Sequence, residues 1–132
     1  MTEPGDRVLV LDNGIYGKGF ADFVSMYGGC PELYSRDYRE TLDVQELENF
    51  LKEHHNYKYA TVVHGDTPSG MLNDVSAICP LLKKYGIMTV VDSVSASSVK
   101  QCVSPTGRLT LCAAAPRSCL RASRADFCSH QR

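Results

Sequence analysis

The chain has 132 residues, of which 43% are hydrophobic and 22% are charged, and its formal net charge at pH 7 is −1. This length and composition suit one compact globular domain. No apolar run is long enough to cross a membrane, and the first residues lack the basic and apolar segments of a secretory signal. We therefore expect no membrane association and a cytoplasmic location.

The composition changes abruptly near Ser97. From there to Arg132 the chain carries six lysines and arginines against the single acid Asp126, and it holds four of the six cysteines. The cysteines lack the paired spacing of a zinc site, and the segment has no hydrophobic period. We therefore divide the chain into residues 1–96, which we expect to be ordered, and residues 97–132, an aperiodic tail that we predict to be disordered.

Strands and helices are predicted to alternate through residues 1–96. Three short apolar runs indicate buried strands, over Arg7–Leu11, Tyr59–Val63 and Ile87–Val91. Apolar residues at helical spacing follow the first strand, and Asp43 with Glu46 matches a capping box that opens a second helix. A further helix precedes the third strand. This order predicts an α/β fold with a mainly parallel sheet.

Each predicted strand ends in a polar, turn-rich segment: Asp12–Gly17, His64–Gly70 and Asp92–Ser95. Ligands of parallel sheets bind beyond the carboxyl ends of the strands, so we expect the three segments to meet at one edge and form a site. His64 and Asp66 have no further histidine or cysteine at ligand spacing nearby, and a metal site is therefore not predicted.

Four motifs carry a resemblance to a known family: Pro-Gly-Asp-Arg-Val-Leu-Val from Pro4, Asn-Gly-Ile-Tyr-Gly from Asn13, Val-His-Gly-Asp-Thr-Pro-Ser-Gly from Val63 and Val-Val-Asp-Ser-Val-Ser-Ala from Val90. In order and spacing they resemble class V aminotransferases of the alanine/serine–glyoxylate type. The resemblance implies part of a fold-type I large domain, pyridoxal 5'-phosphate as cofactor, small amino and oxo acids as substrates, and a homodimer for the intact relative. It implies no nucleic-acid partner.

The same resemblance assigns roles to four residues. Asp92 matches the carboxylate that pairs with the pyridine nitrogen of the cofactor, and Tyr16 matches an aromatic residue stacked on the ring. Val94 matches the apolar residue at the other face of the ring, and Thr67 matches a hydroxyl that hydrogen-bonds the cofactor. Outside the family the local patterns also suit a turn or cap aspartate, a packed aromatic ring and a turn threonine.

Essential parts of the family's chemistry are missing from the sequence. The lysine that forms a Schiff base with the cofactor belongs to a Gly-Ser-Gln-Lys segment, but Cys112–Cys119 contains no lysine, so no catalytic residue is assigned. A reading frame shifted by one base permits Cys-Gly-Gly-Ser-Gln-Lys over Cys112–Ser118 and Ala-Asp-Trp over Ser104–Gly107. We therefore interpret the tail as an out-of-frame translation that begins between about Ser95 and Ser98, and the chain as a truncated fragment.

The sequence leaves several functions open. The leading hypothesis is a fragment of an aminotransferase that moves an amino group from alanine or serine to glyoxylate or pyruvate, inactive as this chain alone. The alternatives are a fragment of a 2-aminoethylphosphonate or ureidoglycine aminotransferase, or a non-enzymatic α/β binding module with a basic tail. For the intact relative, a peroxisomal or mitochondrial location is also open.

Overall fold

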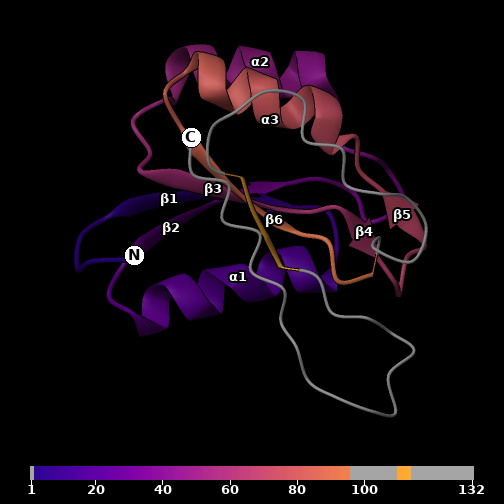
Figure 1. The fold of residues 1–132 in the computed structure, drawn as a ribbon, viewed down its shortest axis with the longest axis horizontal. Coiled ribbons are helices and arrows are strands. Elements are labelled where there is room, and N and C mark those ends of the chain that lie inside the picture. The colour runs from indigo at the N-terminus through magenta and orange to yellow at the C-terminus, as the bar shows by residue number, and fades with distance from the viewer. Residues whose placement is uncertain (1, 96–109, 114–132) are drawn as a thin grey trace.

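The computed structural model describes residues 2–95 and 110–113. One helix, α1, lies on one face of a parallel sheet, and two helices, α2 and α3, lie side by side on the other (Figure 1). The elements are β1 (Arg7–Asp12), α1 (Ile15–Met26), β2 (Cys30–Ser35), α2 (Val44–Glu53), β3 (Tyr59–Val63), β4 (Gly65–Asp66), β5 (Met71–Leu72), α3 (Val75–Lys84), β6 (Met88–Asp92) and β7 (Thr110–Ala113).

The main sheet has five strands in the order β2-β1-β3-β6-β7, and every neighbouring pair is parallel. Val8 of β1 pairs with Tyr59 of β3, and Tyr59 pairs in turn with Met88 of β6. The α/β fold and the parallel arrangement of the three predicted strands are thus confirmed. The third strand begins one residue later than predicted and extends to Asp92.

The sheet is apolar on both faces, which explains the continuous apolar runs of its strands. Alternate residues of β1 enter two separate clusters, with Val8 and Val10 toward α1 and Leu9 and Leu11 toward α2 and α3. The cluster under α2 and α3 is the larger one and contains the buried residues Leu47, Leu51, Ile78 and Leu82. The helices therefore cover the sheet, and polar side chains gather at the strand ends.

Local signals fix the ends of two helices. The Asp43 carboxylate accepts a hydrogen bond from the backbone N–H of Glu46 at 2.9 Å and so caps α2. The reciprocal half of the predicted capping box is absent, because the Glu46 carboxylate pairs with Arg36. Asp74 caps α3, and Gly86, with φ of 73°, follows the C-cap Tyr85 at the end of that helix. None of the helices in the described part of the chain has the length and apolarity needed to span a membrane.

The edge strand β2 and the β4–β5 hairpin were not predicted within residues 1–96. The edge strand β2 contains Pro31, which a strand tolerates where only one neighbour pairs with it, and only Tyr34 of its side chains is buried. The short antiparallel strands β4 and β5 form a hairpin inside the segment predicted as a loop. Both elements have little buried apolar surface, so hydrophobic periodicity does not reveal them.

The prediction that no packed secondary structure follows Ser98 is wrong at β7. Thr110–Ala113 pairs in parallel with β6, from Thr89 opposite Thr110 to Asp92 opposite Ala113. Without this strand, β6 would present an edge of unpaired backbone groups, and the short apolar run that begins at Leu109 has the composition to extend the sheet. Residues 96–109 and 114–132 lie outside the described residues, so the disorder and the frame shift stay predictions there.

Candidate functional site

The three polar segments after β1, β3 and β6 meet at the carboxyl edge of the sheet, as predicted. The backbone N–H of His64 donates to the carbonyl of Asp92 at 2.8 Å. The hydroxyls of Thr67 and Ser95 are 2.6 Å apart and form a hydrogen bond. We call this group of segments the edge site.

Asp92 is the last residue of β6 and is half-buried. Its Oδ1 accepts a hydrogen bond from the backbone N–H of Val94 at 3.0 Å, which fixes the turn that follows the strand. Among the described residues, Oδ2 has no hydrogen-bond partner. The carboxylate therefore holds its own turn with one oxygen and has the other available for a ligand that donates a hydrogen bond.

Tyr16 and Val94 belong to different segments of the edge site. Tyr16 lies in the first turn of α1 with about half of its side chain exposed, while Val94 is half-buried in the turn after β6. An exposed aromatic ring at a helix N-terminus can present its face to a planar ligand. The structure thus leaves the predicted ring-contacting residues accessible.

Thr67 is exposed in the turn between β4 and β5. Its hydrogen bond to Ser95 joins the segment after β3 to the segment after β6. A hydroxyl can donate one hydrogen bond and accept others. The sequence did not single out Ser95.

Asp66 is packed against the beginning of α1. Its side chain is only 3% exposed, and its Oδ2 accepts from the backbone N–H and the hydroxyl of Ser69. A Cβ atom at Gly14 would lie 2.7 Å from Cγ of Asp66, so the glycine makes room for the carboxylate. A negative charge is favourable at a helix N-terminus, and α1 has no side-chain cap of its own. Asp66 is therefore in close contact with the residue before α1, the helix that carries Tyr16, although its Oδ1 is buried without a hydrogen-bond partner among the described residues.

A buried pair of amides, Asn13 and Asn73, ties the edge site together. Nδ2 of Asn13 donates to Oδ1 of Asn73 at 2.8 Å, and Nδ2 of Asn73 donates to Oδ1 of Asn13 at 3.0 Å. Asn73 also donates to the carbonyl of Val63 and accepts from the backbone N–H of Leu42, while Asn13 donates to the carbonyl of Glu40. The pair therefore links the end of β1, the end of β3 and the segment before α2.

The pairing of Asn13 with Asn73 was not predicted from the sequence. Asn13 was recognised only as turn chemistry, and Asn73 adjoins the capping residue of α3. A buried asparagine must satisfy several donors and acceptors, but the residue that satisfies them is sixty positions away.

His64 is buried, and its Nδ1 lies 3.2 Å from the hydroxyl of Ser93. This contact gives the imidazole a structural partner beside β6. Within residues 2–95 and 110–113, histidine, cysteine and acidic side chains form no group of three or more that could hold a metal ion.

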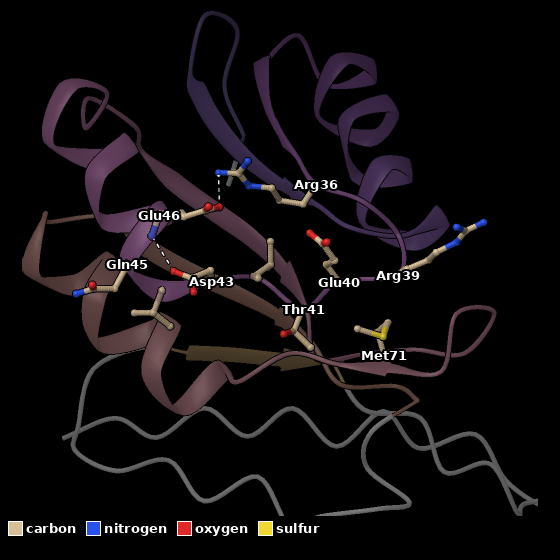
Figure 2. A pocket seen from close by; sticks show the side chains of 10 residues that line it. Arg36, Arg39, Glu40, Thr41, Asp43, Gln45, Glu46 and Met71 are labelled. Carbon is tan, nitrogen blue, oxygen red and sulfur yellow. Dashed lines mark hydrogen bonds and ion pairs between the residues drawn. The ribbon is translucent and has the colours of Figure 1, made fainter.

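A hollow of about 700 Å³ lies beside the segment before α2 and does not coincide with the edge site. The guanidinium of Arg36 points to Glu46 across it, at 2.8 Å, as Figure 2 shows. The same guanidinium donates to the hydroxyl of Tyr34, and this hydrogen bond raises the pKa of Arg36. None of the residues that line the hollow is among the predicted cofactor contacts Tyr16, Thr67, Asp92 and Val94.

The three segments of the edge site contain no lysine. Lys58 lies before β3, at the opposite end of the sheet, and forms ion pairs with Glu3 and Asp6. Lys84 pairs with Glu48 between α3 and α2. The region in which the family resemblance places the reactive lysine follows β7 and lies outside the described residues.

Comparisons with known proteins agree with this geometry. The model of the aminotransferase class-V family matches residues 4–104. The chain is 38% identical over 97 residues to a pyridoxamine–pyruvate transaminase of Mesorhizobium japonicum, and the match covers 72% of this chain and 24% of that protein. It is 32% identical over 89 residues to a 2-aminoethylphosphonate–pyruvate transaminase of Bacillus cereus, and that match covers 67% of this chain and 26% of the relative.

A solved structure has the same fold. The alanine–glyoxylate aminotransferase of Nostoc sp. superposes with a TM-score of 0.67 at 27% identity, over 72% of this chain and 25% of that one. The chain spans about a quarter of the length of the curated relatives that it matches. Class V aminotransferases use pyridoxal phosphate. Because the family model matches most of its length, the chain belongs to the aminotransferase class-V family.

Proposed function

We propose that this chain is the ring-contacting part of a pyridoxal-phosphate-dependent aminotransferase. The intact enzyme would move an amino group from alanine or serine to glyoxylate or pyruvate. The observation that carries the proposal is Asp92, whose Oδ2 is available at the carboxyl edge of the sheet while Oδ1 holds the following turn. When bound, the cofactor supplies a protonated pyridine ring that withdraws electrons from the reacting carbon of the substrate.

Each residue of the chain has a distinct part in this proposal. Asp92 would accept a hydrogen bond from the pyridine N–H and keep that nitrogen protonated, because an anion favours the charged form of its partner. Tyr16 would stack on one face of the ring and Val94 would contact the other. Thr67 would hydrogen-bond the cofactor while Ser95 holds its hydroxyl in place. Together these contacts orient the ring without carrying out the covalent chemistry.

The names of the relatives support the identity of the amino acceptor more firmly than that of the amino donor. Two of them are named for pyruvate, but their named amino donors differ. A 2-aminoethylphosphonate or ureidoglycine aminotransferase is therefore retained as an alternative, as is a homodimer for the intact enzyme. We place that enzyme in the cytoplasm. The division into a partial large domain, residues 1–96, and an out-of-frame tail, residues 97–132, is part of the same proposal.

Pyridoxamine is a second candidate for the amino donor. One relative is named for this compound, and its pyridine ring would make the same contacts with Asp92 and Tyr16 as the ring of the cofactor. In that case the edge site holds a substrate rather than a bound cofactor.

Binding of pyridoxamine phosphate to the full chain tests the ring contacts, because this compound cannot form an imine with a lysine. Stacking and one charge-assisted hydrogen bond contribute on the order of 1 to 3 kcal/mol each before ordering costs, so we expect a dissociation constant of about 1 mM. Asp92→Asn should weaken binding about tenfold, because a neutral amide no longer matches the pyridinium. Asp37→Asn, the same change at an exposed loop residue, is the matched control.

Equal binding by the Asp92 and Asp37 variants would contradict the proposed role of Asp92. Comparison with unphosphorylated pyridoxamine tests the second candidate, which requires binding of at least equal strength. With pyridoxal phosphate, borohydride reduction and mass spectrometry should reveal no adduct at a single lysine, and alanine with glyoxylate should not react. A specific adduct accompanied by turnover would show that this chain has a reactive lysine after all.

A further inference from the structure

Asn13 is followed by Gly14, and an asparagine loses its side-chain ammonia most readily when a glycine follows it. In this reaction the backbone nitrogen of the glycine attacks the carbonyl carbon of the asparagine side chain, Cγ. Glycine has no side chain to hinder the approach. Asn13 is the only asparagine of the chain that precedes a glycine, since the others precede phenylalanine, tyrosine and aspartate.

Both reacting groups lie in the edge site. Within the described part of the chain, the backbone N–H of Gly14 donates no hydrogen bond, so the attacking nitrogen is not held. The side chain of Asn13 is held by three hydrogen bonds. Its Nδ2 donates to Oδ1 of Asn73 at 2.8 Å and to the carbonyl of Glu40 at 3.1 Å, and its Oδ1 accepts from Nδ2 of Asn73 at 3.0 Å. The amide pair, rather than the glycine, therefore controls the reaction.

The closed amide pair opposes the attack. Bond formation at Cγ turns a planar amide into a tetrahedral centre and draws it into a cyclic imide, which carries Oδ1 and Nδ2 out of the plane in which they pair with Asn73. The three hydrogen bonds must therefore break first, at a residue that is only 2% exposed. The water that opens the imide must also reach this buried position. We therefore expect the reaction to proceed through molecules in which the pair has opened.

The product cannot restore the pair, because the orientation of Asn73 is set from its other side. Its Oδ1 accepts from the backbone N–H of Leu42 and its Nδ2 donates to the carbonyl of Val63, so the amide cannot flip without losing both bonds. An oxygen in the place of Nδ2 at position 13 would face two acceptors, Oδ1 of Asn73 and the carbonyl of Glu40. A carboxylate is therefore repelled where the amide was bound.

We propose that Asn13 is a deamidation site that the amide pair keeps unreacted. When the pair opens, the Gly14 nitrogen bonds to Cγ of Asn13, the bond from Cγ to Nδ2 breaks, and Nδ2 leaves as ammonia with the proton from Gly14. Water then opens the cyclic imide at either carbonyl and leaves aspartate or isoaspartate. The former places a carboxylate in the pair, and the latter lengthens the backbone by a methylene group just before α1. A single opening can thus disable the edge site permanently.

Mass spectrometry of the full chain, incubated for weeks at neutral pH in reducing buffer, tests this proposal. Trypsin releases residues 8–18 as one peptide that contains Asn13, and its deamidated forms gain mass and separate by chromatography. We expect deamidation at Asn13 to be at least about 100-fold slower in native buffer than in concentrated urea, because few molecules open a buried contact of this kind. A rate in native buffer within a few fold of the rate in urea would overturn the proposal.

Two variants test whether the protection comes from the amide pair. Asn73→Ala should raise the rate at Asn13 in native buffer about tenfold or more, because the side chain that holds the amide is gone. Asn49→Ala, the same change at an exposed residue of α2, should leave the rate unchanged. Equal rates at Asn13 in the two variants would contradict the proposal.

Asn13→Asp imitates the product, and this test does not depend on the folding of Asn73→Ala. It should lower the midpoint of urea unfolding by about 2 M or prevent folding, because a buried carboxylate replaces the paired amide. Asn49→Asp, the same change on the surface of α2, should leave the midpoint nearly unchanged. Equal midpoints for these two variants would overturn the proposal. No measurement here uses the cofactor, so such a result leaves the proposed cofactor contacts standing.

Discussion

Replacement of Asn73 by alanine removes the centre of the buried amide pair. The substitution deletes the two hydrogen bonds to Asn13, the donor to the Val63 carbonyl and the acceptor for the backbone N–H of Leu42. All four bonds are in buried surroundings, where Asn73 itself is 1% exposed. The groups that remain cannot pair with one another, because the side chain between them is gone.

The size of the effect follows from these four bonds. A buried hydrogen bond contributes about 1 kcal/mol net, and a buried group left without a partner costs about 1 to 3 kcal/mol. Some of that cost is recovered by water that enters the space, so we expect a loss of about 3 to 4 kcal/mol. A domain of this size is stable by about 5 to 15 kcal/mol in total. Asn73→Ala should therefore remove a large part of its stability.

Urea unfolding followed by circular dichroism measures this loss, which should lower the midpoint by about 2 M. Asn49→Ala is the matched control. Asn49 is exposed on α2, and within the described part of the chain its side chain bonds only to Lys52, so the loss of stability should stay within about 0.5 kcal/mol. If the free energy of unfolding of Asn73→Ala is within about 1 kcal/mol of that of the unaltered chain, the amide pair does not hold the edge site together.

Three further predictions use the same unfolding assay or NMR. Gly14→Ala should cost about 1 to 3 kcal/mol because its methyl group meets a buried carboxylate, whereas Gly19→Ala, in open space on the same helix, should be neutral or slightly stabilising; equal effects would contradict the close contact. Asp43→Ala should cost about 1 kcal/mol, and Asp43→Ser much less, because serine also caps a helix. The hydrogen bond from Lys58 keeps the pKa of Asp6 below its ordinary 3.8. The stability that this bond contributes is therefore present above pH 3.8 and is lost as the pH falls through the lowered pKa. In Lys58→Met an NMR titration should find the pKa of Asp6 raised, and an unchanged value would refute the role of Lys58.

The sequence predicted the parts of the fold that depend on buried apolar surface. The runs in β1, β3 and β6 are apolar on both faces, and the cap at Asp43 is a local signal, so each is visible in a short window of sequence. The edge strand β2 escaped prediction because one buried residue, Tyr34, is too little for a pattern. The strand β7 was not predicted because it is held by pairing with β6, a contact that the local sequence of β7 does not indicate.

The edge site, too, could be predicted from the sequence only in part. The segments that hold Tyr16, Thr67 and Asp92 could be placed together because parallel strands end at one edge. The contacts within the site could not be predicted, since the Thr67–Ser95 hydrogen bond and the fit of Asp66 against Gly14 join residues that are distant in sequence. Helical periodicity also misled in α1, where Phe23 and Tyr27 fit the apolar pattern but point to solvent rather than to the core.

The strand order also constrains how the sheet can assemble. β1, α1 and β2 are consecutive in the chain and pair with one another, so this unit can form early from nearby residues. β3 and β6 also pair with each other, with α3 between them in the chain, and β3 must join the other side of β1 to complete the sheet. Such parallel pairings close long loops before they gain contacts, which makes them slow. We therefore expect the open edge of β1 to be the surface on which the folding chain is most prone to aggregate until β3 arrives.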